Sequence, residues 1–151
     1  MSLTMNLENY QLSNYAQNNP DVRVIFYPIT SWVAERIKNK NKDVSFLDEF
    51  QDLIEKHYHD DRFRAKQCAR MMKMSETQLF KRLKSLTNQG FASYLRIYRL
   101  RKAKDLIEYN QELTISEIAY DVGFTDPNYF SRAFSQIFGQ SPSSYRRTSY
   151  S

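Results

Sequence analysis

Apolar residues recur at helical spacing along most of the chain, and no alternating strand pattern occurs after residue 43. One apolar stripe covers residues 46–54 and follows the capping-box pattern Ser45-x-x-Asp48. A longer stripe begins after Gly90 and continues to residue 107. The pattern predicts an all-α domain that begins near residue 43.

One sequence unit occurs twice in this domain. A shift of 50 residues places Ala69 on Ala119, and a shift of 51 places Leu83 on Phe134. Polar and capping positions match as well as apolar ones, which favours a true repeat over chance alignment. Each copy fits a helix, a tight turn and a second helix, so the sequence predicts two helix-turn-helix units.

The predicted units divide the chain into parts. The first subdomain covers residues 43–89, a long linker helix 90–109, and the second subdomain 110–147, so the double helix-turn-helix domain spans 43–147 with a tail at 148–151. Residues 1–42 are interpreted as an N-terminal extension or linker remnant, partly disordered. Their pattern suggests a short strand over 22–27, a helix over 31–38 and a linker over 39–42.

Capping residues mark the second helix of each unit. Ser75 and Asp126 fit as N-caps, which predicts helices over 75–86 and 127–137. Four residues at turns or helix ends are candidates for left-handed backbone angles: Asn88, Gly123 and Gly139, and also Lys73 if the first turn has the geometry of the second. For Lys73, at the turn position that Gly123 occupies in the second copy, this conformation costs about 1–2 kcal/mol.

The second helix of a helix-turn-helix unit lies in the major groove, with its N-terminal half against the base edges. Sorting the two helices by face leaves eight candidates for reading bases: Glu76, Thr77, Phe80, Lys81, Asn128, Tyr129, Ser131 and Arg132. Lys81 and Arg132 can donate to guanine and Asn128 suits adenine, although the two cations fit solvated surface charge as well. Glu76 either accepts from cytosine or stabilises the helix dipole.

Five residues are candidates for binding the DNA phosphates: Ser75, Lys84, Arg96, Arg101 and Lys102. The last three lie on the linker helix, where no base-reading role requires a cation. Phosphate contacts fix the register of a protein on DNA and supply affinity that depends on salt. Arg99, near the apolar side of the linker helix, is expected instead to pair with an acid inside the protein.

Charge is unevenly distributed along the chain. The formal net charge is +5, and residues 62–104 contain thirteen Lys or Arg but one acid, Glu76. The flanking segments are acidic, with seven acids over 43–61 and six over 105–126. This segregation indicates a basic face that suits nucleic acid, the alternative being a set of solvated helix faces.

Other classes of protein find little support in the sequence. The single Cys excludes an intrachain disulfide and fits a reducing compartment, so a cytoplasmic, nucleoid-associated location is expected. No apolar run is long enough to span a membrane, and no signal-peptide pattern opens the chain. His57 and His59 do not share a helix face, and no catalytic motif is present. We expect no enzyme activity, no cofactor and no metal.

From Ala65 onward the sequence resembles the DNA-binding domain of the arabinose-regulator (AraC/XylS) family of bacterial transcription factors. The most specific matching run is Ile115-Ser116-Glu117-Ile118-Ala119-x-x-x-Gly123-Phe124, followed by Tyr129-Phe130-Ser131-Arg132-x-Phe134 and Phe138-Gly139-x-Ser141-Pro142-x-x-Tyr145-Arg146. The resemblance implies seven helices, with two helix-turn-helix subdomains joined by one rigid helix. It also implies that both recognition helices face the same side of the DNA, about one helical turn apart.

The segment from Leu79 to Thr87 also resembles the variant found at the C-termini of two-component hybrid sensors and response regulators. It implies a missing upstream sensor or receiver domain, with membrane tethering only in the case of a hybrid sensor. Ser135 departs from the family pattern, since it replaces the usual lysine. The sequence therefore predicts a double-stranded DNA-binding transcription regulator that recruits RNA polymerase. The alternative is a helical protein-interaction module whose basic face no longer reads DNA.

Overall fold

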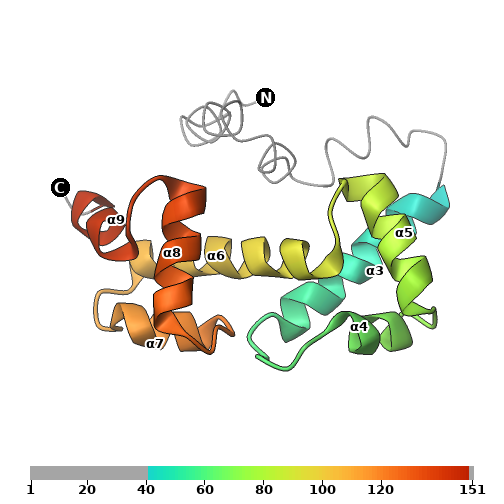
Figure 1. Ribbon diagram of the computed structural model, residues 1–151, viewed down its shortest axis with the longest axis horizontal. Coiled ribbons are helices and arrows are strands. Elements are labelled where there is room, and N and C mark those ends of the chain that lie inside the picture. Colours follow the sequence, from blue (N-terminus) through green and yellow to red (C-terminus); the bar gives the residue numbers. More distant parts are fainter. Residues whose placement is uncertain (1–40, 150–151) are drawn as a thin grey trace.

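The computed structural model describes residues 41–149, and these form seven helices and no strand (Figure 1). The helices are α3 (Asn41–His57), α4 (Ala65–Met71), α5 (Glu76–Thr87), α6 (Phe91–Tyr109), α7 (Ile115–Asp121), α8 (Pro127–Phe138) and α9 (Pro142–Ser149). The predicted all-α fold is confirmed. The strand expected over 22–27 and the helix over 31–38 lie outside the described residues.

Helix α3 begins at Asn41, four residues before the predicted Ser45 start. The prediction of a linker over 39–42 is therefore wrong for its last two residues. Asp43 lies in the first turn, where a carboxylate favours the helix dipole, and its side chain pairs with Arg82 of α5. This partner from a later helix holds the first turn of α3 in place.

Two apolar cores form at the two ends of α6. In the first core, Phe91 and Leu95 of α6 pack with buried side chains from α3, α4 and α5. In the second, α6 packs with α7 and α8 through Ile97, Leu100, Ala103 and Ile107. Because it serves both cores, α6 is the predicted linker helix.

The two helix-turn-helix units repeat the same backbone geometry. Both turns contain a residue with positive φ, 55° at Lys73 and 89° at Gly123. Helices α5 and α8 also end alike, on left-handed Asn88 (57°) and Gly139 (75°). The four predicted left-handed positions are confirmed, so the sequence repeat is a structural repeat.

N-caps fix the start of each recognition helix. The Ser75 hydroxyl accepts a hydrogen bond from the backbone N–H of Gln78 at 3.2 Å, and the Gln78 side chain accepts from the Ser75 N–H at 2.9 Å. The Asp126 carboxylate accepts from the N–H of Asn128 at 2.8 Å, and Pro127 occupies the first turn of α8. Both predicted N-caps are confirmed.

Ser75→Ala is expected to lower the free energy of unfolding by about 1 kcal/mol, because the first turn of α5 loses its cap. Ser85→Ala, at an exposed position inside the same helix, is the matched control and should be neutral or slightly stabilising. Urea denaturation followed by circular dichroism measures both. A loss at Ser85 equal to that at Ser75 would contradict the capping role.

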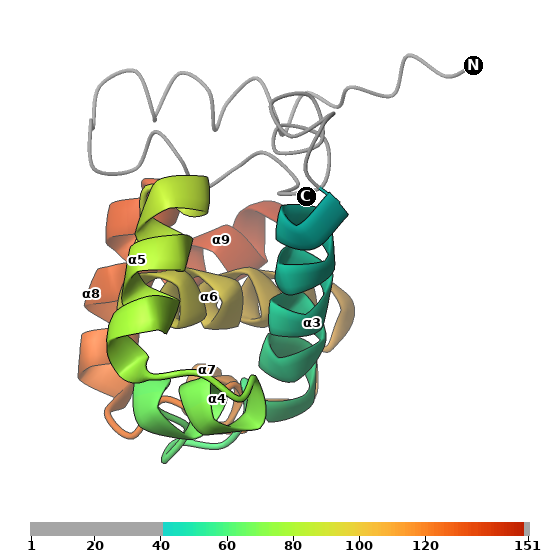
Figure 2. The ribbon, with the colours of Figure 1, turned by 90° about the vertical axis from the view of Figure 1, so that its right-hand side faces the viewer.

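Helices α5 and α8 lie near opposite ends of α6 (Figure 1), and both lie on the same side of it, with α3 on the other side (Figure 2). Since α6 has 19 residues, it is about 28 Å long. This length is close to one turn of B-DNA, about 34 Å. The fold therefore presents two similar helices on one side of α6, near its opposite ends.

Candidate nucleic-acid interface

The outer face of α5 carries the predicted base-reading side chains of the first unit. Glu76, Thr77 and Lys81 are exposed, and Phe80 is 56% exposed, which is unusual for so large an apolar side chain. Leu79 and Leu83 lie on the opposite face and are buried in the first core. The division of α5 into an outer and a buried face is as predicted.

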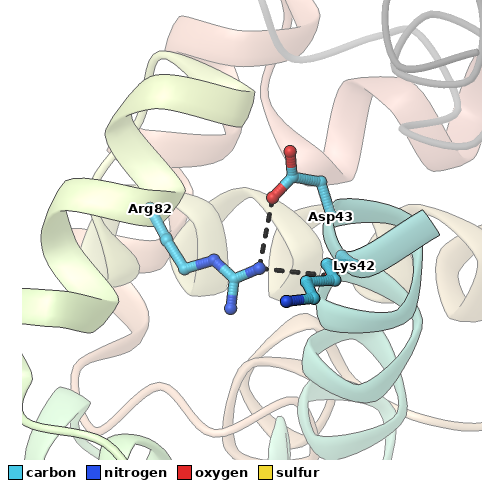
Figure 3. Close-up of polar contacts among 3 residues, drawn as sticks. All are labelled: Lys42, Asp43 and Arg82. Carbon is cyan, nitrogen blue, oxygen red and sulfur yellow. Dashed lines mark hydrogen bonds and ion pairs between the residues drawn. The ribbon is translucent and has the colours of Figure 1, made fainter. Parts of the chain in front are cut away.

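Arg82 is a cation of α5 that points back into the protein. Its Nη2 donates to the Lys42 carbonyl oxygen and to the Asp43 carboxylate, both at 3.1 Å (Figure 3). Its guanidinium also lies 4.2 Å from the centre of the Phe46 ring, a cation–π distance. Arg82 therefore fixes α5 against α3, and the outer face of α5 is left to the other side chains.

The outer face of α8 exposes three of its four predicted base-reading side chains. Asn128 and Arg132 are exposed, and Tyr129 is 42% exposed, with its ring 6.0 Å from that of Phe124. Ser131 is half-buried, and its carbonyl oxygen accepts a hydrogen bond of 2.8 Å from the hydroxyl of Ser135. The structure brings Asn128, Tyr129 and Arg132 to the surface together and places Ser131 at the edge of that surface.

A groove of about 580 Å³ lies between the two units. Glu76 of α5 and Tyr129 of α8 both line it, so the first turns of the two recognition helices meet the same groove. Arg96 of α6 also lines it, and one Nη donates weakly to the Tyr129 hydroxyl at 3.4 Å. Its buried Nε finds no acceptor within the described part of the chain. The guanidinium of Arg96 therefore lies beside both recognition helices and makes only this one weak hydrogen bond among residues 41–149.

The three linker cations project in different directions. At 100° per residue, Arg101 points about 140° away from Arg96 around the α6 axis, and Lys102 about 120° away. Lys102 Nζ binds the Glu55 carboxylate of α3 at 2.9 Å and lies over the Tyr58 ring. The structure brings Arg96, but not Arg101 or Lys102, to the groove between the recognition helices.

Two predicted phosphate-binding residues have roles within the protein. The Ser75 hydroxyl oxygen caps α5, although its O–H proton remains available to donate to a phosphate oxygen. Lys84 Nζ donates to the carbonyl oxygen of Asn88 at 2.9 Å and completes the C-terminal end of the helix. Both residues are exposed, so these hydrogen bonds do not prevent a phosphate contact. Phosphate binding by Ser75 and Lys84 stays a prediction.

Sequence reasoning missed two cations of the groove, Arg64 and Lys66, which lie at the start of α4. Their signal was the basic segment 62–104, but the sequence gives no sign that the start of α4 lies beside the recognition helices. The start of α4 lines the groove together with the starts of α5 and α8. Together with Arg96, these residues make the groove basic.

Metal and thiol chemistry find no geometric support. Among residues 41–149 no group of three or more His, Cys, Asp or Glu side chains converges on a metal site. The His57 ring stacks on Phe63 with ring centres 5.0 Å apart. Burial, followed by the charge of Glu49, raises the pKa of the Cys68 thiol to about 12, so this thiol belongs to the core.

A model of a helix-turn-helix domain family matches residues 68–148, which is more than half of the chain. The C-terminal domain of the response regulator YesN from Fusobacterium nucleatum is 32% identical, with a TM-score of 0.63 over 68% of this chain and 98% of that one. This chain belongs to the AraC family of helix-turn-helix domains. The resemblance seen in the sequence is confirmed.

Two further similar proteins show the contexts in which such domains occur. The DNA-binding domain of AdpA, a global transcriptional factor solved with a target DNA, is 27% identical, with a TM-score of 0.62 over 68% of this chain and 90% of that one. Histidine kinase P4 of Formosa agariphila is 27% identical over 148 residues, 97% of this chain and 11% of that protein. The chain spans 11% to 41% of the curated relatives compared with it.

Among residues 41–149, no helix combines the length and the apolar content needed to cross a lipid bilayer.

Proposed function

We propose that this AraC-family domain binds double-stranded DNA sequence-specifically and regulates transcription, by inserting α5 and α8 into two successive major-groove segments. The observation that carries the proposal is the placement of two exposed recognition helices on one side of α6 (Figure 2). Their first turns meet one groove lined by Arg64, Lys66 and Arg96. Between two successive major-groove segments the DNA presents its phosphate backbone. The basic groove of the protein is suited to bind that backbone.

Base reading is proposed for the exposed outer side chains. Lys81 and Arg132 are at equivalent positions of the two units and suit guanine, and Asn128 suits adenine. Phe80 and Thr77 suit the thymine methyl group, which explains why a phenyl ring on α5 remains exposed. Glu76 lines the groove, where its carboxylate either stabilises the N-terminal end of α5 or accepts a hydrogen bond from cytosine.

Phosphate binding is proposed first for Arg96, which lines the groove and whose guanidinium makes one weak hydrogen bond, 3.4 Å long, among the described residues. Ser75 and Lys84 lie on or beside α5 and are exposed. Arg101 is exposed on another side of α6, and Lys102 must first leave Glu55. We therefore rank Arg101 and Lys102 below Arg96 as phosphate ligands.

The rest of the regulator is proposed from the size of its relatives. A chain that spans 11% of a histidine kinase suits the output end of a longer protein, with a sensor or receiver part upstream. RNA polymerase is the partner through which a DNA-bound activator acts on transcription. Contact with chromosomal DNA places the domain in the cytoplasm, at the nucleoid, including when an upstream part is membrane-tethered. Proteins of this family are generally not enzymes, and no catalytic role is proposed.

Selection of sites from a random double-stranded DNA pool, at about 150 mM salt with random competitor, tests the function. We expect an enriched motif of two blocks about ten base pairs apart. Binding to the selected site should weaken steeply with salt, with a log–log slope near −4 to −5 if about five phosphates are bound. A single enriched block would mean that only one unit reads bases. Weak binding without enrichment would instead favour the protein-interaction module.

A further inference from the structure

The two helix-turn-helix units meet at a seam that does not belong to either apolar core. At its centre is Arg99 of α6, whose Nε donates to the carbonyl oxygen of Tyr58 at 2.6 Å and whose Nη2 donates to that of Asp60 at 2.7 Å. Both carbonyls belong to the loop between α3 and α4, in the first unit. One side chain of the linker helix therefore holds that loop at two points.

The second unit reaches the same carbonyl. A Cβ added to Gly123, in the turn between α7 and α8, would lie 2.6 Å from the Tyr58 carbonyl oxygen and 2.9 Å from Nε of Arg99. The turn of the second unit thus packs directly on the hydrogen bond that Arg99 makes with the first. The Tyr58 side chain packs against both cores, and its ring lies 5.5 Å from that of Tyr98.

Charge strengthens the seam. Burial, followed by repulsion from Arg64, lowers the pKa of Arg99, but a guanidinium remains charged at physiological pH. Its two bonds to carbonyl oxygens are therefore charge-assisted and stronger than neutral ones. Asp60 and Asp61 provide the opposite charge beside it.

We propose that the seam formed by Arg99, the Tyr58 and Asp60 carbonyls and Gly123 sets the spacing between the two DNA blocks that the domain accepts. The inference rests on the proposed function. The length of helix α6 limits the distance between the two units. Each unit packs on its own end of α6, and a further contact is needed to fix the angle of one unit relative to the other. Arg99 is thus a positioning residue: it lines the groove, but both of its hydrogen bonds hold backbone within the protein and so fix the angle between α5 and α8.

A change of one base pair between the blocks tests this angle sharply. It moves one block by about 3.4 Å and rotates it by about 34–36° around the DNA axis. A rigid pair of recognition helices cannot follow that rotation, and either one helix loses its bases or the DNA must deform. Two recognition helices that can pivot relative to each other can follow part of that rotation.

The experiment compares affinities for the selected site with its spacer lengthened or shortened by one and two base pairs. The wild-type domain should lose about tenfold or more in affinity per base pair, comparable to a mismatch. Arg99→Met removes the donors at similar side-chain length and should reduce that penalty to about threefold, while binding at the optimal spacer also weakens. Arg99→Lys keeps the charge, is less disruptive to folding and should give an intermediate spacing penalty.

Arg101→Met is the matched control, since it removes the same charge from an exposed position of α6. It should lower affinity by one common factor at every spacer. A spacing penalty in either Arg99 variant equal to that of the wild type would overturn the inference, as would a wild-type domain that tolerates every spacer. Failure of the wild type to select any two-block site would instead overturn the proposed function.

Discussion

Replacing Gly123 with alanine is expected to lower the free energy of unfolding by about 3 kcal/mol. The φ of 89° at this position is strained for any residue with a side chain. The added methyl group would also lie 2.6 Å from the Tyr58 carbonyl oxygen, which is backbone and is held by Arg99. The seam between the two units has to open to admit it. Urea denaturation followed by circular dichroism measures the loss.

Gly139→Ala separates backbone strain from the clash. Gly139 has a similar φ of 75°, but an added Cβ there meets no atom within 4 Å among the described residues. In this variant the free energy of unfolding should therefore fall only by the cost of placing a side chain in the left-handed conformation, about 1–2 kcal/mol. Equal losses at Gly123 and Gly139 would show that the close approach at the seam contributes nothing to stability.

Lys81→Ala and Arg132→Ala are each expected to weaken binding to the selected DNA site by about 1–3 kcal/mol, on the order of 5- to 150-fold. Each side chain is exposed on the outer face of its recognition helix, where a bidentate contact with guanine is available. Each variant should also lose base preference in one block only. Titration by fluorescence anisotropy on the selected site and on random DNA measures both effects.

Lys56→Ala is the charge-matched control for these two variants. Lys56 is exposed in the last turn of α3. Helix α3 lies on the other side of α6 from the recognition helices (Figure 2). Its removal should change affinity little, and equally on both DNAs. If Lys81→Ala and Arg132→Ala weakened binding to random DNA as much as to the selected site, both residues would be phosphate contacts and not readers of bases.

Local patterns predicted most of the fold correctly. The bounds of the linker helix and of both recognition helices differ from the predicted ones by a single residue at each end or less. The reason is that helical periodicity, N-caps and left-handed turn residues act within about four residues of the chain. Lys73 is the clearest case: alignment with Gly123 predicted its positive φ, although its own residue type did not.

Long-range partners were predicted less well. Arg99 was expected to pair with an acid and instead donates to two backbone carbonyls. The sequence did not predict that Lys102 lies against Glu55, 47 positions away in the chain. The early start of α3 likewise depends on Arg82, 39 positions after Asp43. In each case a long, charged side chain could pair with several acceptors. The sequence does not show which helix or loop lies beside that side chain, so it does not identify the acceptor.

The sequence by itself determined the class of fold, the repeat of two helix-turn-helix units and the outer side chains of their recognition helices. These features follow from the order of apolar, capping and turn residues, which act over one or two helical turns. The tertiary structure alone decided that α5 and α8 lie on one side of α6, that Arg96 lines the groove between them, and that Arg99 and Gly123 meet at one carbonyl. Such contacts depend on the angles at which helices pack, and those angles are set by residues that lie far apart in the sequence.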